Sequence, residues 1–187
     1  MVDSKVLMEN EAEWLPTRSG RLIGVAPHRA ARGKQRPRNR NPSKPMKTVL
    51  FLCTGNYYRS RFAEILFNWT ANAQSLPWQA DSRGLQLHAE NPGPISSHVV
   101  RFLGQQGIRL AEPIRFPRQV SESDLQAADL VIAAKEAEHR PLLERNFGAW
   151  VDRVEYWDIH DVEVCSPNEA LPILTRRVHD LVRRLLA

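Results

Sequence analysis

The segment CTGNYYRS, residues 53–60, carries residue types that suit phosphate chemistry: Cys53 and Arg59 are separated by five residues that include Gly55 and Asn56. Successive loop N–H groups at the amino end of a helix form a nest that binds an anion, and glycine permits the backbone angles of such a turn. A guanidinium grips two phosphate oxygens at once. A cysteine beneath this nest is favoured as the thiolate, the form that acts as a nucleophile. The segment therefore predicts an oxyanion site with a nucleophile behind it.

Strands and helices must position this segment, and the sequence predicts them from short apolar runs and helical patterns that alternate along residues 47–187. The patterns predict strands over 47–53, 84–90, 129–134 and 153–159. They predict helices over 60–73, 96–107, 121–128, 135–147 and 174–187, the fourth interrupted at Pro141. Such alternation is typical of an α/β fold, here a doubly wound, four-stranded parallel sheet with helices on both faces. Ligands bind beyond the carboxyl ends of such strands, which is where Cys53 falls.

The charge distribution divides the chain in two. The 187 residues have a formal net charge of +5, but residues 1–45 hold ten Lys/Arg and four Asp/Glu, or +6, and the remaining 16 basic and 17 acidic residues sum to −1. We expect a flexible basic extension over 1–45 and a folded domain over 46–187. The extension could bind nucleic acid, although a solvated tail is the simpler interpretation. A native start at Met46 is a further alternative.

Cysteine and histidine usage limits the possible classes of protein. The two cysteines, Cys53 and Cys165, are too few for a disulfide scaffold and favour a reducing compartment. No apolar run approaches the roughly 20 residues that span a bilayer, and the amino terminus lacks the pattern of a secretory signal. We therefore expect a cytoplasmic protein with no membrane partner.

The histidines are not at metal-ligand spacing, so we expect no metal and no cofactor. We interpret four of them as surface or helix-packing residues: His98, His139, His160 and His179.

Residues 53–60 resemble the phosphate-binding loop of the low-molecular-weight protein tyrosine phosphatases, whose pattern C-x-G-N-x-x-R-S is filled here at every fixed position. Weaker similarity extends over residues 46–187. DSRG at 81–84 is similar to a Ser-x-Gly element of the family's second strand, and AADLVIAA at 127–134 to its third. The resemblance implies the phosphotyrosine protein phosphatase I-like fold.

The resemblance also implies roles for individual residues. Cys53 would attack phosphorus and form a phosphocysteine, and Arg59 with the loop amides would stabilise the equatorial oxygens in the transition state. Ser60 would hydrogen-bond the Cys53 sulfur, and Asn56, supported by Ser82, would hold the loop from behind. The implied phosphate-binding residues are Thr54, Gly55, Asn56, Tyr57, Tyr58, Arg59 and Ser60.

Family members place a general acid, an Asp followed by Pro, after the last strand. The segment VEYWDIHDVE offers Asp158 and Asp161, and alignment on its tryptophan favours Asp161. Val162 replaces the expected proline, which predicts a less rigid acid loop. No tyrosine pair follows, so a preference for phosphotyrosine is not implied. Tyr58 stands where many members carry a second cysteine.

The function that these residues predict is hydrolysis of a phosphomonoester through a cysteinyl-phosphate intermediate. The substrate would be a phosphorylated small molecule or a phosphoprotein. An arsenate reductase is one alternative; the thioredoxin-coupled type needs two further cysteines where only Cys165 exists, so an external small thiol would have to act. A phospho-ligand binding module without turnover is the other alternative.

Overall fold

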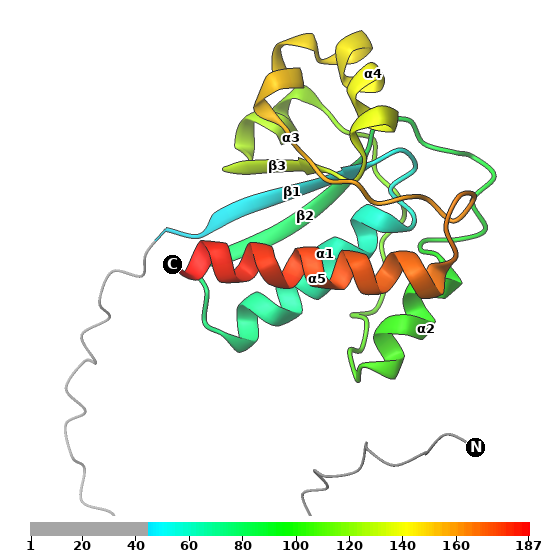
Figure 1. Ribbon diagram of the computed structural model, residues 1–187, viewed down its shortest axis with the longest axis vertical. Coiled ribbons are helices and arrows are strands. Elements are labelled where there is room, and N and C mark those ends of the chain that lie inside the picture. Colours follow the sequence, from blue (N-terminus) through cyan, green and yellow to red (C-terminus); the bar gives the residue numbers. More distant parts are fainter. Residues whose placement is uncertain (1–44) are drawn as a thin grey trace, which may run out of the picture. The chain divides into compact units, whose positions relative to one another are not determined.

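The computed structural model describes residues 45–187, and the predictions for the basic N-terminal extension lie outside the described residues. The described part contains a four-stranded parallel sheet in the order β2-β1-β3-β4 (Figure 1). Its strands are β1 (Lys47–Cys53), β2 (Trp78–Gly84), β3 (Leu130–Ala133) and β4 (Glu155–Tyr156). The predicted α/β fold with a four-stranded parallel sheet is confirmed.

Strand β1 occupies the middle of the sheet because it is apolar on both faces. Val49 and Phe51 belong to the core on one face, and Leu50 and Leu52 to the core on the other. All four are at most 2% exposed. Central parallel strands are covered by helices on both faces, so they lack the alternation of apolar and polar residues that is typical of a strand with one face in solvent. β1 ends at Cys53, on the edge of the sheet where the carboxyl ends of the strands meet.

Helices cover both faces of the sheet (Figure 1). Helices α1 (Arg59–Ala73) and α5 (Pro167–Leu186) lie side by side on one face, and α2 (Ser97–Gln105) contributes to the same core. On the other face lie α3 (Glu122–Ala127), α4 (Glu136–Asn146) and the 3-10 helix η1 (Gly148–Arg153). None of the helices between residues 45 and 187 has the length and apolar character needed to traverse a bilayer.

The second strand lies upstream of the predicted one, so the prediction of 84–90 was wrong. β2 pairs with β1 from Lys47↔Trp78 to Cys53↔Gly84. Its inward positions are small or polar, Ala80, Ser82 and Gly84, and give no apolar alternation. The alternating leucines that suggested a strand lie just beyond it: Leu85 is buried, whereas Leu87 is 37% exposed.

Three other boundaries differ from the predictions. α4 continues through Pro141, which removes the hydrogen bond to the Ala137 carbonyl without ending the helix. α5 begins at Pro167, well before residue 174, because Ser166 and Glu169 form a capping box. The fourth strand is shorter than 153–159, although backbone bonds from the amides of Trp157 and Ile159 continue the contact with β3 and the residue after it.

Candidate active site

The phosphate-loop segment, residues 53–60, connects the end of β1 to the start of α1. Cys53 is 3% exposed, and its Sγ lies 3.0 Å from the Ser60 Oγ in the first turn of α1. The first amides of an α-helix have no partner within the helix, so the start of α1 at Arg59 supplies donors beside the thiol. A hydroxyl at hydrogen-bond distance can donate to a thiolate and stabilise its negative charge.

Asn56 determines the course of the loop. Its φ of 50° lies in the left-handed region, which asparagine tolerates better than most residues. The buried side chain compensates with four hydrogen bonds. Its Nδ2 donates to Ser60 Oγ at 3.1 Å and to Ser82 Oγ at 2.8 Å, while its Oδ1 accepts from Arg115 NH1 at 3.0 Å and from the Arg118 amide at 2.9 Å. The loop is thus attached to α1, to β2 and to the segment between α2 and α3.

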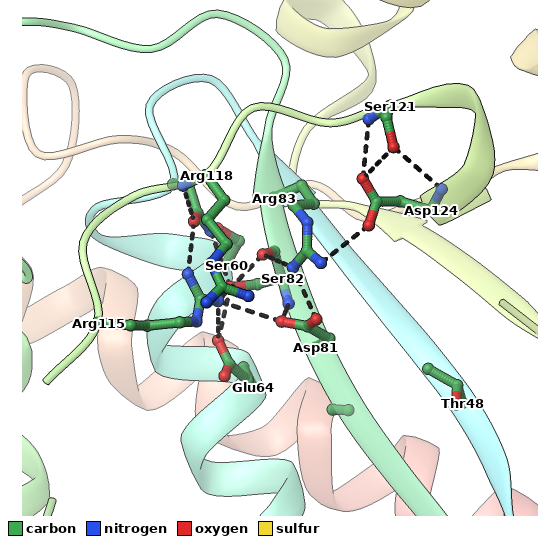
Figure 2. Close-up of polar contacts among 12 residues, drawn as sticks. Thr48, Ser60, Glu64, Asp81, Ser82, Arg83, Arg115, Arg118, Ser121 and Asp124 are labelled. Atoms are coloured by element: carbon green, nitrogen blue, oxygen red, sulfur yellow. Dashed lines mark hydrogen bonds and ion pairs between the residues drawn. The ribbon is translucent and has the colours of Figure 1, made fainter. Parts of the chain in front are cut away.

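Arg115 and Glu64 form a cluster of ion pairs and hydrogen bonds around Ser82, one of the partners of Asn56 (Figure 2). Arg115 NH2 lies 2.7 Å from Glu64 Oε2 and 2.9 Å from Ser82 Oγ, and it also contacts Asp81 at 3.2 Å. The Ser82 hydroxyl in turn donates to Glu64 Oε2 at 2.6 Å. Charged donors and acceptors make stronger bonds than neutral ones, so this cluster fixes Ser82 and Arg115 where Asn56 needs them.

β2 approaches the phosphate loop so closely that Gly84 leaves no room for a side chain. A Cβ on Gly84 would lie 2.8 Å from the Thr54 carbonyl oxygen and 3.1 Å from the Asn56 amide nitrogen. Immediately after it, the amide of Leu85 donates to the Cys53 carbonyl at 2.9 Å. The glycine of the DSRG segment therefore permits the contact between β2 and the loop.

Arg59 lies beside the thiol and is 1% exposed. Its NH1 bonds the Ile159 carbonyl at 3.0 Å and Glu138 Oε2 at 2.7 Å, and its NH2 pairs with Asp161 Oδ2. Burial alone would lower the pKa of Arg59, but the negative charges of Cys53, Asp161 and Glu138 outweigh it and raise the pKa above its ordinary value. The guanidinium therefore stays charged in the buried site.

The two candidate acids lie in different surroundings. Asp161 lines the cavity above Cys53, pairs with Arg59 and accepts at its Oδ1 from the Val162 amide at 2.8 Å. Asp158 is largely exposed and pairs with Lys135, whose hydrogen bond and charge lower its pKa. Of the two carboxyl groups only Asp161 lines the cavity above the thiol, so the geometry favours Asp161 as the acid. A proline at 162 has no backbone N–H and could not donate the hydrogen bond that the Val162 amide makes to Asp161.

A cavity of about 340 Å³ opens above the thiol. Cys53, Thr54, Gly55, Tyr57, Tyr58 and Asp161 contribute to its walls. The segment after β2 forms the opposite side with His88 and Asn91, and it is attached to the loop by bonds from Ser96 N to the Tyr57 carbonyl and from the Tyr57 hydroxyl to the Pro92 carbonyl. The volume suits one phosphorylated side chain or a small phosphate ester.

His139 supports the loop from α4, a role that the sequence interpretation missed. It is fully buried, its Nδ1 accepts from the Lys135 amide at 2.9 Å, and its Nε2 therefore carries the proton that bonds Thr54 Oγ1 at 3.3 Å. Burial and the Arg59 and Lys135 charges lower the pKa of His139 to about 3, against the weaker raising effect of its bond to the Lys135 backbone. It is neutral at physiological pH.

The structure brings the predicted residues together but adds others that the sequence interpretation missed. Cys53, Arg59 and Asp161 meet at one place, with Asn56, Ser60 and Ser82 packed behind the loop. Their catalytic roles remain predictions. The added supports come from segments without a motif: Glu64, Arg115, Glu138 and His139. Among residues 45–187 no group of three or more His, Cys, Asp or Glu side chains is placed to hold a metal ion.

Comparison with known proteins places this site in a family. Residues 48–184 match the family model described as low molecular weight phosphotyrosine protein phosphatase. The chain belongs to this family. A solved low molecular weight protein tyrosine phosphatase from T. tengcongensis has 27% sequence identity and a TM-score of 0.63, with 74% of this chain and 99% of that chain covered. The resemblance that the loop motif predicted is confirmed, and it supports a cysteine-dependent phosphatase.

Two kinds of curated relative are similar to this phosphatase-family chain. A protein-arginine-phosphatase of Bacillus subtilis is 32% identical over 106 residues, which cover 57% of this chain and 67% of that protein. An arsenate reductase of Brevibacillus brevis is 34% identical over 87 residues, or 46% of this chain and 57% of that protein. The chain thus spans little more than half the length of the reductase.

Proposed function

We propose that the protein hydrolyses phosphate esters through a cysteinyl-phosphate intermediate on Cys53. The observation that supports this most directly is the meeting of a thiol, a buried guanidinium and a carboxylate at one cavity: Cys53 and Asp161 line it, and Arg59 lies beside the thiol and pairs with Asp161. A thiol supplies the nucleophile, a guanidinium stabilises transferring phosphoryl oxygens, and a carboxyl group supplies and accepts protons.

In the first step, the Cys53 thiolate attacks phosphorus and forms an S–P bond while the ester P–O bond breaks. Asp161, protonated, gives its proton to the leaving oxygen, so that an alcohol or phenol departs rather than an alkoxide. Arg59 and the loop amides stabilise the charge on the equatorial oxygens. Ser60, 3.0 Å from the sulfur, stabilises the thiolate by a hydrogen bond.

In the second step, water attacks the phosphocysteine. Asp161, now a carboxylate, takes a proton from that water, and the S–P bond breaks to release inorganic phosphate and the Cys53 thiolate. The bond from Ser60 favours sulfur as a leaving group. The mechanism requires a reduced thiol, so we infer a cytoplasmic location, and Cys53 and Cys165 are both free in the structure.

Members of the family act on phosphorylated substrates, and the cavity accommodates a group the size of one side chain. We infer a phosphorylated protein side chain or a small phosphate ester as the substrate. The Bacillus relative is named for phosphoarginine and the family for phosphotyrosine. A panel of phosphotyrosine and phosphoarginine peptides, assayed for released phosphate, distinguishes these two classes.

The decisive variant is Cys53→Ser, assayed with p-nitrophenyl phosphate in buffer without thiol. We expect the wild-type protein to hydrolyse the ester and the variant to lose turnover by at least about 10³-fold, because an alcohol is a far weaker nucleophile at neutral pH. Binding of inorganic phosphate, measured by calorimetry, should persist in the variant. Turnover that survives the substitution would contradict the proposal, and a wild-type protein that binds phosphate without hydrolysis would be a binding module.

The same preparation tests arsenate reduction, which the similarity to arsenate reductases makes a second candidate. A reductase would consume arsenate only when a thiol is supplied, and it would show little thiol-free hydrolysis of p-nitrophenyl phosphate. We expect the opposite result.

Asp161→Ala tests the acid. We expect kcat to fall by about 10²- to 10³-fold for phenyl phosphate, whose leaving group needs a proton, and by less for p-nitrophenyl phosphate. Asp158→Ala provides the matched control, since its carboxylate faces Lys135 rather than the cavity. If Asp158→Ala reproduces the leaving-group effect and Asp161→Ala does not, the acid is Asp158.

A further inference from the structure

We propose that the hydroxyl of Tyr58 positions the Asp161 carboxyl group during catalysis, once a bound phosphate has displaced Asp161 from Arg59. Tyr58 would be a positioning residue that acts through Asp161 and does not touch the reacting atoms. The inference rests on the function proposed above and adds a residue to it.

The first observation is an unpartnered hydroxyl beside the site. Tyr58 immediately precedes α1, is 6% exposed, and packs its ring into the core together with Ile159 and Leu171. The hydroxyl oxygen is fully buried, and no hydrogen-bond partner for it exists among residues 45–187. A buried donor without a partner is destabilising, so this hydroxyl would gain from any acceptor that comes within reach.

The second observation is that Tyr58 and Asp161 line the same cavity. Burial raises the pKa of Tyr58 far above its ordinary value, and the nearby Asp161 and Cys165 raise it further, while Arg59 has the opposite effect. The phenol therefore remains protonated at every physiological pH and offers a hydrogen. Asp161 is close enough for its charge to act on this hydroxyl.

The third observation is that Asp161 cannot act from its present position. Its Oδ2 pairs with Arg59 and its Oδ1 accepts from the Val162 amide at 2.8 Å. Both oxygens are therefore engaged, whereas a general acid needs one oxygen free to hold a proton toward the leaving group. The Arg59 NH1 is already bonded to Ile159 and Glu138, whereas its Nε has no hydrogen-bond partner in the described part of the chain. Two phosphate oxygens that bind the guanidinium as a fork through Nε and NH2 would therefore compete with Asp161 for NH2.

These observations combine into an exchange of partners. When phosphate oxygens take the Arg59 NH2, Asp161 loses a charged partner and turns to the neutral donor of Tyr58. A phenol holds one carboxyl oxygen in place without opposing protonation as strongly as a guanidinium does, since it has no full positive charge. The Tyr58 hydroxyl would share Oδ1 with the Val162 amide, which leaves Oδ2, released from Arg59, free to give a proton to the leaving group.

The test is Tyr58→Phe, which keeps the ring and removes only the hydroxyl. With phenyl phosphate we expect kcat to fall about tenfold, a fraction of the 10²- to 10⁴-fold that a general acid contributes, and with p-nitrophenyl phosphate to fall less. In an Asp161→Asn background the same substitution should have no effect, because a residue that acts through Asp161 has nothing left to position. The thermal midpoint without ligand should rise by about 2–4 °C, since the unpartnered hydroxyl is gone.

Tyr156→Phe is the matched control. Its hydroxyl donates to the Val151 carbonyl at 2.9 Å on β4, away from the cavity, so its removal should lower the thermal midpoint and leave the activity unchanged. The proposal is overturned if Tyr58→Phe keeps the wild-type rate on phenyl phosphate, or if it slows the Asp161→Asn variant as much as the wild type. Hydrolysis that does not depend on Cys53 would instead overturn the proposed function, and this inference with it.

Discussion

Arg59 illustrates how single residues prepare the site before any ligand arrives. Its guanidinium is almost fully buried, yet Glu138 and Asp161 surround it with negative charge. A buried charge without partners is strongly unfavourable, whereas a paired one is tolerated. Phosphate can replace one carboxylate without leaving the guanidinium unpaired, so the loop can bind and release an anion while its arginine stays in place.

His139 gives the first prediction at this scale, a pH dependence of stability. The folded pKa of His139 is about 3, below the ordinary 6.5, so below pH 6.5 the unfolded chain binds a proton that the folded protein excludes. The free energy of unfolding should therefore decrease as the pH is lowered, by about 2 kcal/mol from pH 7.5 to pH 5 from this group alone. Urea unfolding at a series of pH values measures the slope.

The pH dependence of the free energy of unfolding is compared between His139→Gln and a control, His179→Gln, which lies on the exposed face of α5. We expect His139→Gln to be less stable at pH 7.5, because it loses its packing, but to show a flatter decline toward pH 5. His179→Gln should keep the wild-type slope. An unchanged slope in His139→Gln would refute a neutral, buried imidazole behind Thr54.

At the scale of elements, the site depends on how closely β2 approaches the phosphate loop. We predict that Gly84→Ala lowers the free energy of unfolding by about 1–3 kcal/mol, because the new Cβ would meet backbone atoms of Thr54 and Asn56 that cannot move without distorting the loop. Activity on p-nitrophenyl phosphate should fall as well. Denaturant unfolding and initial rates measure the two effects.

Gly104→Ala is the matched control, because Gly104 lies in α2 and an added Cβ would meet no atom within 4 Å beyond its chain neighbours and the backbone of its own helix. We expect it to be neutral or stabilising by up to about 1 kcal/mol, since alanine is the better helix former. Equal stability of the two variants would show that β2 does not constrain the loop in this way.

The elements also show what could be predicted from the sequence. The strand β1 and the loop motif were predictable because a continuous apolar run and a fixed residue spacing are local signals. β2 was misplaced because its buried positions are the small residues Ala80, Ser82 and Gly84, which give no apolar pattern, and the last two contact the loop. Arg115 and His139 were missed because each reaches the loop from a distant segment by a single side chain, which no local pattern reveals.

At the scale of the whole molecule, the parallel sheet explains why residues more than 100 positions apart share one site. β1, β3 and β4 run in the same direction (Figure 1). Cys53 at the end of β1, Glu138 after β3 and Asp161 after β4 therefore meet at one edge of the sheet. The two cores on either side hold the sheet rigid beneath it. A rigid edge with side chains from several loops is the usual location of ligand sites in open α/β sheets.

The central claim is that Cys53 carries the phosphoryl group, and mass spectrometry of acid-quenched enzyme tests it most directly. Asp161→Asn should slow both steps but especially the attack of water, so phosphoenzyme should accumulate during turnover of p-nitrophenyl phosphate. We predict one phosphoryl group on the peptide that contains Cys53, and none in a Cys53→Ala variant. Turnover with Cys53 unmodified, or a phosphoryl group on a different residue, would contradict the account.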